Sequence, residues 1–204
     1  MTDRTSHWDS IYSTRDTREV SWYQPRPETS LRLIDRLGID KSDAVIDVGG
    51  GASSLVDHLV EQAFEAVTVM DISTSALQAV KERLGAKAAR VQWLAGDITR
   101  QGPPGPFGLW HDRAVFHFLV EPVDRARYVD ALTAALPPGG AAIVATFAEN
   151  GPERCSNLPV RRYDPDTLAA ELGTAFEMTE ALRETHVTPA QGRQNFIYCC
   201  FRRR

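Results

Sequence analysis

The sequence predicts an α/β protein in which helices cover both faces of a mostly parallel sheet, and two observations support this fold class. Short apolar, β-branched runs alternate with segments of helical periodicity along most of the chain. After residue 173 this alternation stops, and two strand-like runs follow one another. We therefore expect a three-layer sandwich with a seven-stranded sheet that ends in an antiparallel hairpin. A single domain over residues 1–204 is expected from the length.

Five apolar runs are the candidates for the parallel strands. Each is almost continuously hydrophobic, which is typical of strands buried on both faces. The runs are residues 44–48, 66–70, 90–94, 109–114 and 141–147. For the hairpin we expect strands at 175–183 and 195–202, joined by a loop over 184–194.

The segments between these runs have helical periodicity and residues that favour helix ends. Pro27 precedes a segment that Gly38 ends, and Ser73 can cap a helix that Gly85 closes. Asp164 can cap a further helix before the hairpin. The apolar positions that give the helical period are Leu31, Ile34, Leu37, Leu55, Val56, Leu59, Val60, Leu77, Val80, Leu84, Val129, Leu132, Leu168 and Leu172.

Composition and charge exclude several classes of protein. The chain carries 23 Lys and Arg against 27 Asp and Glu, a formal net charge of −4, so we expect no nucleic-acid partner because there is no strong basic field. The longest apolar stretch, 141–148, is far shorter than the roughly 20 residues that span a bilayer, and we expect a cytoplasmic protein without a membrane partner. The three cysteines, Cys155, Cys199 and Cys200, form an odd number, which argues against a disulfide framework. No Cys or His spacing indicates a metal site.

A glycine-rich loop follows the first predicted strand. Gly49, Gly50 and Gly51 come two residues after Asp47 and directly before a helical segment. Glycines at such a turn allow a sharp change of direction and let a ligand approach the backbone closely. The same glycines are also compatible with a purely structural turn.

Two carboxylates at later strand ends favour a nucleoside ligand. Asp71 ends the second strand 20 residues after Gly51, where an acid can accept hydrogen bonds from both hydroxyls of a ribose. Asp97 follows the third strand and can meet the amine of an adenine. Ile72 and Ile98 can flank the ring.

The charge beside the glycine loop distinguishes between nucleosides. The chain has Ser54 where the dinucleotide-binding fingerprint has its third glycine. Asp47 would repel a pyrophosphate but suits a cationic, amino-bearing ligand. S-adenosylmethionine has both a sulfonium and an α-ammonium group, so we expect it as the cofactor.

At these motifs the sequence resembles the class I S-adenosylmethionine-dependent methyltransferases, a family with a Rossmann-like fold. The loop from Asp47 to Ser53 is similar to the family's D-x-G-x-G-x-G motif, with Ser53 in the place of the last glycine. Asp71 is similar to the family's ribose-binding acid, and residues 96–98 are similar to its adenine contact.

The resemblance extends from about Leu31 onward. Residues 107–117 resemble the fourth-strand motif, with Gly108 where an acid is common, and 136–140 resemble the turn before the fifth strand. The resemblance implies an enzyme that transfers methyl groups (EC 2.1.1.-), with the terminal hairpin as the family's reversed strand. The cofactor-binding residues that it implies are Trp22, Asp47, Gly49, Gly50, Gly51, Asp71, Ile72, Asp97, Ile98 and Asp112, the last beside the methionine end.

Methyl transfer from a sulfonium requires alignment and exclusion of water, so a catalytic residue is not obligatory. His111, Asp112, His117 and His186 are the candidates if a base is used. His117, which follows the fourth strand, is the candidate among them for catalysis and substrate contact; the alternative is a histidine packed among phenylalanines. His186, in the expected terminal loop, is a second candidate for substrate contact, or else a solvated loop residue.

The N-terminal segment 1–30 is predicted to be a lid. Aromatic residues are concentrated in 7–12 and 21–25, and such side chains are costly to leave in water. In several branches of the family that the sequence resembles, a comparable segment covers the cofactor and part of the acceptor site. We expect Trp22 to contact the cofactor and Tyr23 the substrate; the alternative is packing on the sheet edge.

The expected acceptor is a small molecule with a thiol or, second, a carboxylate, because the site region offers no strong base. Loops 151–159 and 185–189 can wall in a compact pocket, with Arg154 or Arg161 available to a negative charge. Cys155 is expected to be an ordinary loop residue. Two alternatives remain open: a protein lysine methyltransferase and a non-catalytic adenosine-binding module.

Overall fold

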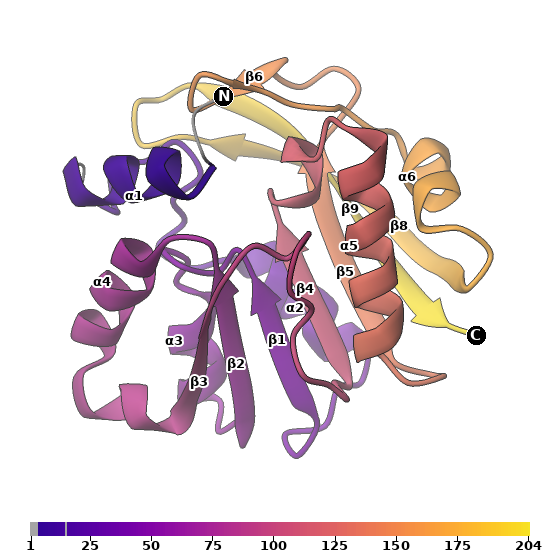
Figure 1. Cartoon of the computed structure of the whole chain (residues 1–204), viewed down its shortest axis with the longest axis horizontal. Coiled ribbons are helices and arrows are strands. Elements are labelled where there is room, and N and C mark those ends of the chain that lie inside the picture. The colour runs from indigo at the N-terminus through magenta and orange to yellow at the C-terminus, as the bar shows by residue number, and fades with distance from the viewer. Residues whose placement is uncertain (1–3, 15) are drawn as a thin grey trace.

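A computed structural model describes residues 4–14 and 16–204, and its main element is a seven-stranded sheet of order β3-β2-β1-β4-β5-β9-β8 (Figure 1). The first five strands are parallel, whereas β9 is antiparallel to both β5 and β8. The predicted fold class is therefore confirmed. The strands are β1 Ala44–Val48, β2 Ala66–Asp71, β3 Val91–Ala95, β4 Leu109–Arg113, β5 Ala141–Phe147, β8 Phe176–Val187 and β9 Arg193–Arg203, and a small separate hairpin consists of β6 Arg154–Cys155 and β7 Leu158–Pro159.

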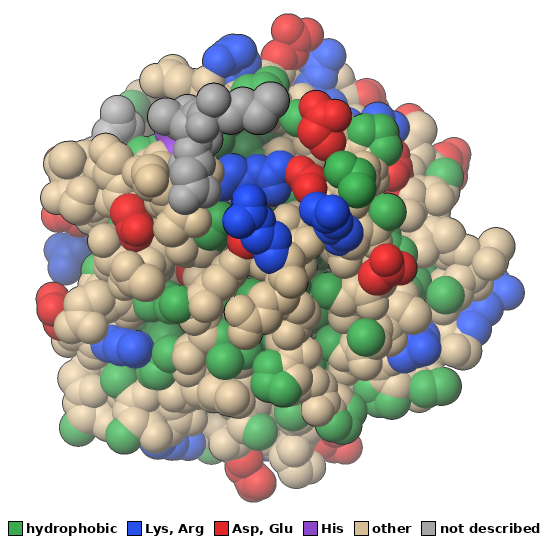
Figure 2. Space-filling model, in the orientation of Figure 1, with side chains coloured by type: hydrophobic (Ala, Val, Ile, Leu, Met, Phe, Trp, Pro, Cys, Tyr) green, Lys and Arg blue, Asp and Glu red, His purple; other side chains and the backbone are tan. Residues whose placement is uncertain are grey.

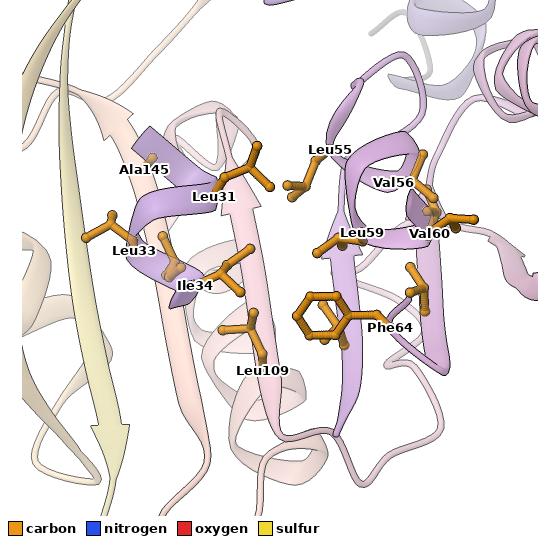
Figure 3. Close-up of a cluster of buried hydrophobic side chains, with 14 of the residues drawn as sticks. Leu31, Leu33, Ile34, Leu55, Val56, Leu59, Val60, Phe64, Leu109 and Ala145 are labelled. Atoms are coloured by element: carbon orange, nitrogen blue, oxygen red, sulfur yellow. The ribbon is translucent and has the colours of Figure 1, made fainter. Parts of the chain in front are cut away.

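Helices cover both faces of the sheet because successive strand residues point to opposite faces. One buried cluster packs the sheet against α2, α3 and α4, and Figure 3 shows Leu31 and Ile34 of α2 near Leu59 of α3. The second cluster contains Tyr128 of α5 and Leu168 of α6. The helices are α1 Arg4–Thr14, α2 Glu28–Arg36, α3 Leu55–Glu61, α4 Thr74–Leu84, α5 Pro122–Ala135 and α6 Pro165–Leu172, with short 3₁₀ turns η1 Gly85–Arg90 and η2 Phe116–Phe118.

The helix ends follow the predicted capping residues. The Ser73 hydroxyl accepts a hydrogen bond from the Ala76 amide at 3.1 Å, and Gly85 follows the end of α4. Asp164 and Thr167 form a reciprocal capping box at the start of α6. These local interactions fix where the helices begin relative to the strand ends.

Several predicted strand boundaries differ from the structure. The hairpin strands extend to Val187 and from Arg193, so the expected loop 184–194 shrinks to 188–192. Strand β8 is the edge of the sheet, and most of its residues alternate between partly buried and exposed, so its polar residues concealed its continuation. The third strand begins at Val91, one residue after the predicted start, because η1 occupies 85–90.

The N-terminal helix α1, which the sequence did not predict as a helix, lies near the carboxyl ends of the parallel strands and packs against α4 (Figure 1). In the described part of the chain, no helix is both long and apolar enough to cross a membrane. The carboxyl edge of β1 to β4, with α1 beside it, is where the candidate site is found.

Candidate functional site

Two adjoining cavities lie at the carboxyl edge of the parallel strands. The larger, cavity A, has a volume of about 860 Å³, and the smaller, cavity B, about 460 Å³. Trp22, Gly49 and Arg113 line both cavities. The carboxyl ends of parallel strands are where α/β proteins typically bind small molecules.

The glycine loop is shaped by the carboxylates that lie against it. Asp71, at the end of β2, accepts hydrogen bonds from the Gly51 amide at 2.9 Å and the Ser73 amide at 2.8 Å. A Cβ atom on Gly51 would lie 2.6 Å from the Asp71 carboxylate, and one on Gly50 would collide with the Asp47 carboxylate. The loop therefore requires glycine at both positions. Burial raises the pKa of Asp71 to about 6, although the two amide donors oppose the shift.

Asp47 belongs to a buried polar network. It is paired in register with His111 on the neighbouring strand β4, and its Oδ1 lies 2.7 Å from His111 Nδ1. The other ring nitrogen of His111 lies 2.8 Å from the Ser30 hydroxyl. Asp47 Oδ2 is buried without a hydrogen-bond partner among the described residues, although Asp47 lines cavity B. This unpaired carboxylate oxygen suits a bound ammonium group.

Asp97 lines cavity A together with Ile72 and Ile98, the three residues expected at an adenine subsite. Its Oδ1 accepts hydrogen bonds from the Thr99 amide at 2.9 Å and hydroxyl at 2.7 Å. Arg4 of α1 lies 4.0 Å from the other oxygen. The arrangement leaves a short acidic side chain fixed at the rim of the cavity.

Helix α1 contributes two aromatic side chains to cavity A that sequence reasoning did not single out. Trp8 packs edge-on against Trp22, with ring centroids 5.7 Å apart, and against Phe118 at 5.0 Å. Tyr12 packs edge-on against Trp22 at 6.1 Å. The spacing of Trp8 and Tyr12, four residues apart, is the signal that could have indicated a helix with one aromatic face.

Helix α1 is attached to the rest of the molecule by polar contacts. Asp9 accepts hydrogen bonds from the Ser73 hydroxyl at 2.6 Å and the Ser75 amide at 3.2 Å. Arg4 forms an ion pair with Asp124 of α5. On the face shown in Figure 2, basic and acidic side chains likewise lie beside one another. These contacts connect α1 to elements on both sides of the cavity.

The far wall of cavity A comes from late segments of the chain. Phe147, Cys155 and Phe196 line it, together with Arg113 at the end of β4. Arg113 Nε donates to the Tyr198 hydroxyl at 2.8 Å, and its Nη1 donates to a backbone carbonyl at 3.0 Å. Burial raises the pKa of the Cys155 thiol to about 11, so the thiol is neutral.

Asp112 lies outside both cavities, contrary to the expectation that it supports the methionine end of the cofactor. Its carboxylate accepts hydrogen bonds from the Val115 and Phe116 amides and, at 2.6 Å, from the Tyr128 hydroxyl of α5. Side chains alternate along β4, so Asp112 points to the sheet face opposite that of His111. Its role here is to fix the turn after the strand.

The two histidines expected to contact substrate do not line either cavity. His117 is fully buried; its Nδ1 accepts from the Phe147 amide at 3.2 Å, and burial together with the Arg113 charge lowers its pKa to about 3. His186 lies on strand β8 rather than in a loop, with its Nε2 2.8 Å from the Ser21 carbonyl oxygen, and burial lowers its pKa. Both therefore act as packing residues, the alternative considered for His117.

Of the three other residues expected to contact the substrate, one lines a cavity and two do not. Tyr23 lines cavity B, next to Trp22. Arg161 forms an ion pair with Glu171 at 2.8 Å, and Arg154 donates to a backbone carbonyl of its own loop. Neither arginine lines the described cavities.

Comparison with known proteins identifies what this architecture is similar to. Residues 45–140 match the family described as "Methyltransferase domain". No curated protein sequence matched the chain.

Solved structures share the fold. The structure described as "Conversion of a Disulfide Bond into a Thioacetal Group during Echinomycin Biosynthesis" has a TM-score of 0.78 at 18% identity, over 98% of this chain and 92% of that one. A 1,6-didemethyltoxoflavin-N1-methyltransferase from Burkholderia thailandensis, solved with S-adenosylhomocysteine, has a TM-score of 0.75 at 22% identity, over 98% and 86%. The N-methyltransferase NodS from Bradyrhizobium japonicum WM9 has a TM-score of 0.71 at 16% identity, over 98% and 99%.

Proposed function

Because this chain is a class I S-adenosylmethionine-dependent methyltransferase, we propose that it transfers the methyl group to a small-molecule nucleophile, with a thiol or a carboxylate as the favoured acceptor. The observation that carries this proposal is the pair of adjoining cavities. Cavity B is polar and contains an unpaired carboxylate oxygen, whereas cavity A is aromatic and flanked by α1. Together they suit a zwitterionic nucleoside and a compact second ligand.

The cofactor half of the site follows from the carboxylates. Asp71 binds the ribose hydroxyls, and Asp97 lies beside the adenine amine between Ile72 and Ile98. Asp47 Oδ2 takes the α-ammonium group in cavity B. Support comes from the fit of the loop, since side chains on Gly50 or Gly51 would fill the space against these carboxylates.

Trp22 and Tyr23 lie where they can cover the amino-acid end of the cofactor, and Gly49 forms the floor beneath it. Gly49 has a φ of +70°, a conformation that favours glycine. With α1 they form the lid proposed for 1–30, of which residues 1–3 and 15 lie outside the described part. A lid of this kind excludes water from the transfer step.

S-Adenosylmethionine supplies a methyl group on a cationic sulfur that leaves without protonation. The residues of the chain therefore need only align the acceptor and exclude water. Cys155 is neutral, and burial raises the pKa of the Tyr12 hydroxyl well above its usual value. Neither side chain serves as a base near neutral pH, which favours an acceptor that arrives already ionised.

A protein lysine is the weaker candidate acceptor. A lysine ammonium must lose a proton before it attacks, and it would enter beside the Arg113 guanidinium. The described residues at the far wall of cavity A provide no carboxylate to receive that proton. These features support a small acceptor over a lysine side chain.

A labelled-methyl assay tests the proposal. The purified protein and labelled S-adenosylmethionine are incubated with the dialysable and the macromolecular fractions of a lysate, each alone, and with a panel of small thiols and carboxylic acids. We expect label on small molecules only. Label confined to macromolecules would favour the lysine alternative, and binding of S-adenosylhomocysteine without transfer in any fraction would favour a non-catalytic adenosine-binding module.

A further inference from the structure

We propose that Arg113 binds an anionic group of the methyl acceptor, and that the substrate class is a small carboxylate or thiolate with an apolar, aromatic-sized body. This inference rests on the proposed function and specifies its substrate. The sequence favoured Arg154 or Arg161 for the acceptor's charge, but neither lines the described cavities. Arg113 takes that place.

The Arg113 guanidinium is held in one orientation. Its Nε donates to the Tyr198 hydroxyl at 2.8 Å, and its Nη1 donates to the Trp22 carbonyl at 3.0 Å. The guanidinium carbon lies 4.4 Å from the centre of the Phe196 ring, a cation–π contact. Segments far apart in sequence thus fix one side chain at the wall of cavity A.

The third nitrogen of this guanidinium has no hydrogen-bond partner among the described residues. This nitrogen, Nη2, is buried, and no carboxylate in the described part of the chain lies within ion-pair distance of Arg113. The hydrogen-bond network reaches a carboxylate only through Tyr198, whose hydroxyl lies 3.5 Å from Glu184. A buried nitrogen of a cationic group without a hydrogen-bond acceptor is costly, and an anionic ligand that accepts from it removes that cost.

The charge acts on the acceptor side of the site. Arg113 contributes to lowering the pKa of His117 and His186, and it favours the thiolate of Cys155. His117 lies in η2 after β4, His186 on the edge strand β8, and Cys155 on the separate β6–β7 hairpin, whereas Asp71 ends β2. The guanidinium therefore faces the half of the site opposite the ribose carboxylate.

The rest of this wall selects the body of the acceptor. Phe118, Phe147 and Phe196 line it, with Trp8 and Trp22 on the side of α1. Such a lining binds apolar or flat molecules. An amine would arrive as an ammonium ion and meet the guanidinium, with no described carboxylate on this wall to compensate.

An anionic acceptor also explains how transfer proceeds without a base. The ionised oxygen or sulfur attacks the methyl carbon with a lone pair and forms the new bond. The bond from carbon to the sulfonium breaks, and its electron pair goes to sulfur, which leaves as a neutral thioether. No proton moves in this step.

The test uses small probes on the protein saturated with S-adenosylhomocysteine. Calorimetry compares benzoate and thiophenol with benzyl alcohol and benzylamine, which share the ring but differ in charge. We expect benzoate to bind the wild type about tenfold or more tightly than benzyl alcohol. Arg113→Met should abolish this preference, Arg113→Lys should keep part of it, and Arg154→Gln, a matched control, should keep all of it.

Three results would overturn the proposal: tighter binding of benzylamine than of benzoate, equal binding of benzoate and benzyl alcohol, or a loss of S-adenosylhomocysteine affinity in Arg113→Met as large as the loss for benzoate. The last would assign Arg113 to the cofactor carboxylate. The probe series on the wild type is decisive even if Arg113→Met does not fold, which thermal unfolding would reveal. A wild type that does not bind S-adenosylhomocysteine would contradict the proposed function itself.

Discussion

The two halves of the site are built differently. The cofactor half consists of carboxylates at the ends of consecutive strands, and two of them, Asp71 and Asp97, accept a hydrogen bond from the backbone amide two residues later. The acceptor half is assembled from α1, η2, β5, β6 and β9, and Arg113, which has no ion-pair partner among residues 4–14 and 16–204, is positioned by Trp22 and Tyr198. The first half is therefore encoded locally, whereas the second exists only after the chain has folded.

The largest effect is expected in the cofactor half. Asp71→Ala removes the acceptor for two ribose hydroxyls, and hydrogen bonds to a charged group contribute about 1.5–3 kcal/mol each. We expect S-adenosylhomocysteine affinity to fall roughly one hundredfold in calorimetry, while the fold survives. The exposed Asp130→Asn on α5 is the control, and an unchanged affinity in Asp71→Ala would show that the ribose lies elsewhere.

Asp47→Asn should separate the two ends of the cofactor. It keeps the shape of the side chain but removes the charge from the unpaired oxygen. We expect about tenfold weaker binding of S-adenosylhomocysteine, and unchanged binding of 5′-methylthioadenosine, which has no amino-acid group. Equal losses for both ligands would mean that Asp47 acts on the loop rather than on the ammonium.

The raised pKa of Asp71 predicts a pH dependence. Only the ionised carboxylate can accept from both hydroxyls, so affinity should fall about tenfold per pH unit below the pKa of about 6. Without ligand, the Asp71 carboxyl takes up a proton near pH 6 in the folded protein but only near pH 3.8, its ordinary pKa, in the unfolded chain. Its contribution to the stability of the fold is therefore complete below pH 3.8 and is lost as the pH rises to about 6. Asp71→Asn should remove the pH dependence of binding; an identical profile in the variant would assign it to another group.

The smallest effect is expected in α1. Trp8→Ala opens the aromatic wall beside Trp22 and Phe118, and we expect turnover to fall a few-fold with little change in thermal stability, because Trp8 is only partly buried. Hydrogen exchange should show that ligand protects the amides of residues 4–14. The exposed Ser6→Ala is the matched control. Equal exchange with and without ligand would make α1 a structural element and not a lid.

The sequence was sufficient for the fold, and most of the residues that it led us to expect at the cofactor line the two cavities. Strand periodicity, capping residues and the spacing from Gly51 to Asp71 are all local signals, and the hydrogen bond between these two residues shows why the spacing matters. Even the misplaced Asp112 could have been recognised, because alternation along β4 puts it on the face opposite His111.

The acceptor half offered no comparable signal. His117 stands one residue before Phe118, yet the second lines the cavity and the first is buried behind it. Arg113 lies within the fourth-strand motif at 107–117, but that motif did not indicate that its charge faces the acceptor, and the arginines at 154 and 161 were favoured instead. Its exposure to the cavity depends on Tyr198, 85 residues away. Tertiary contacts of this length cannot be read from a single sequence.

A crystal structure of the protein with S-adenosylhomocysteine tests the account most directly. We expect the ribose hydroxyls on Asp71, the α-ammonium group on Asp47 Oδ2, and Arg113 Nη2 free of the cofactor beside the sulfur, facing the aromatic wall. A ribose bound away from Asp71, or the cofactor carboxylate seated on Arg113, would contradict it.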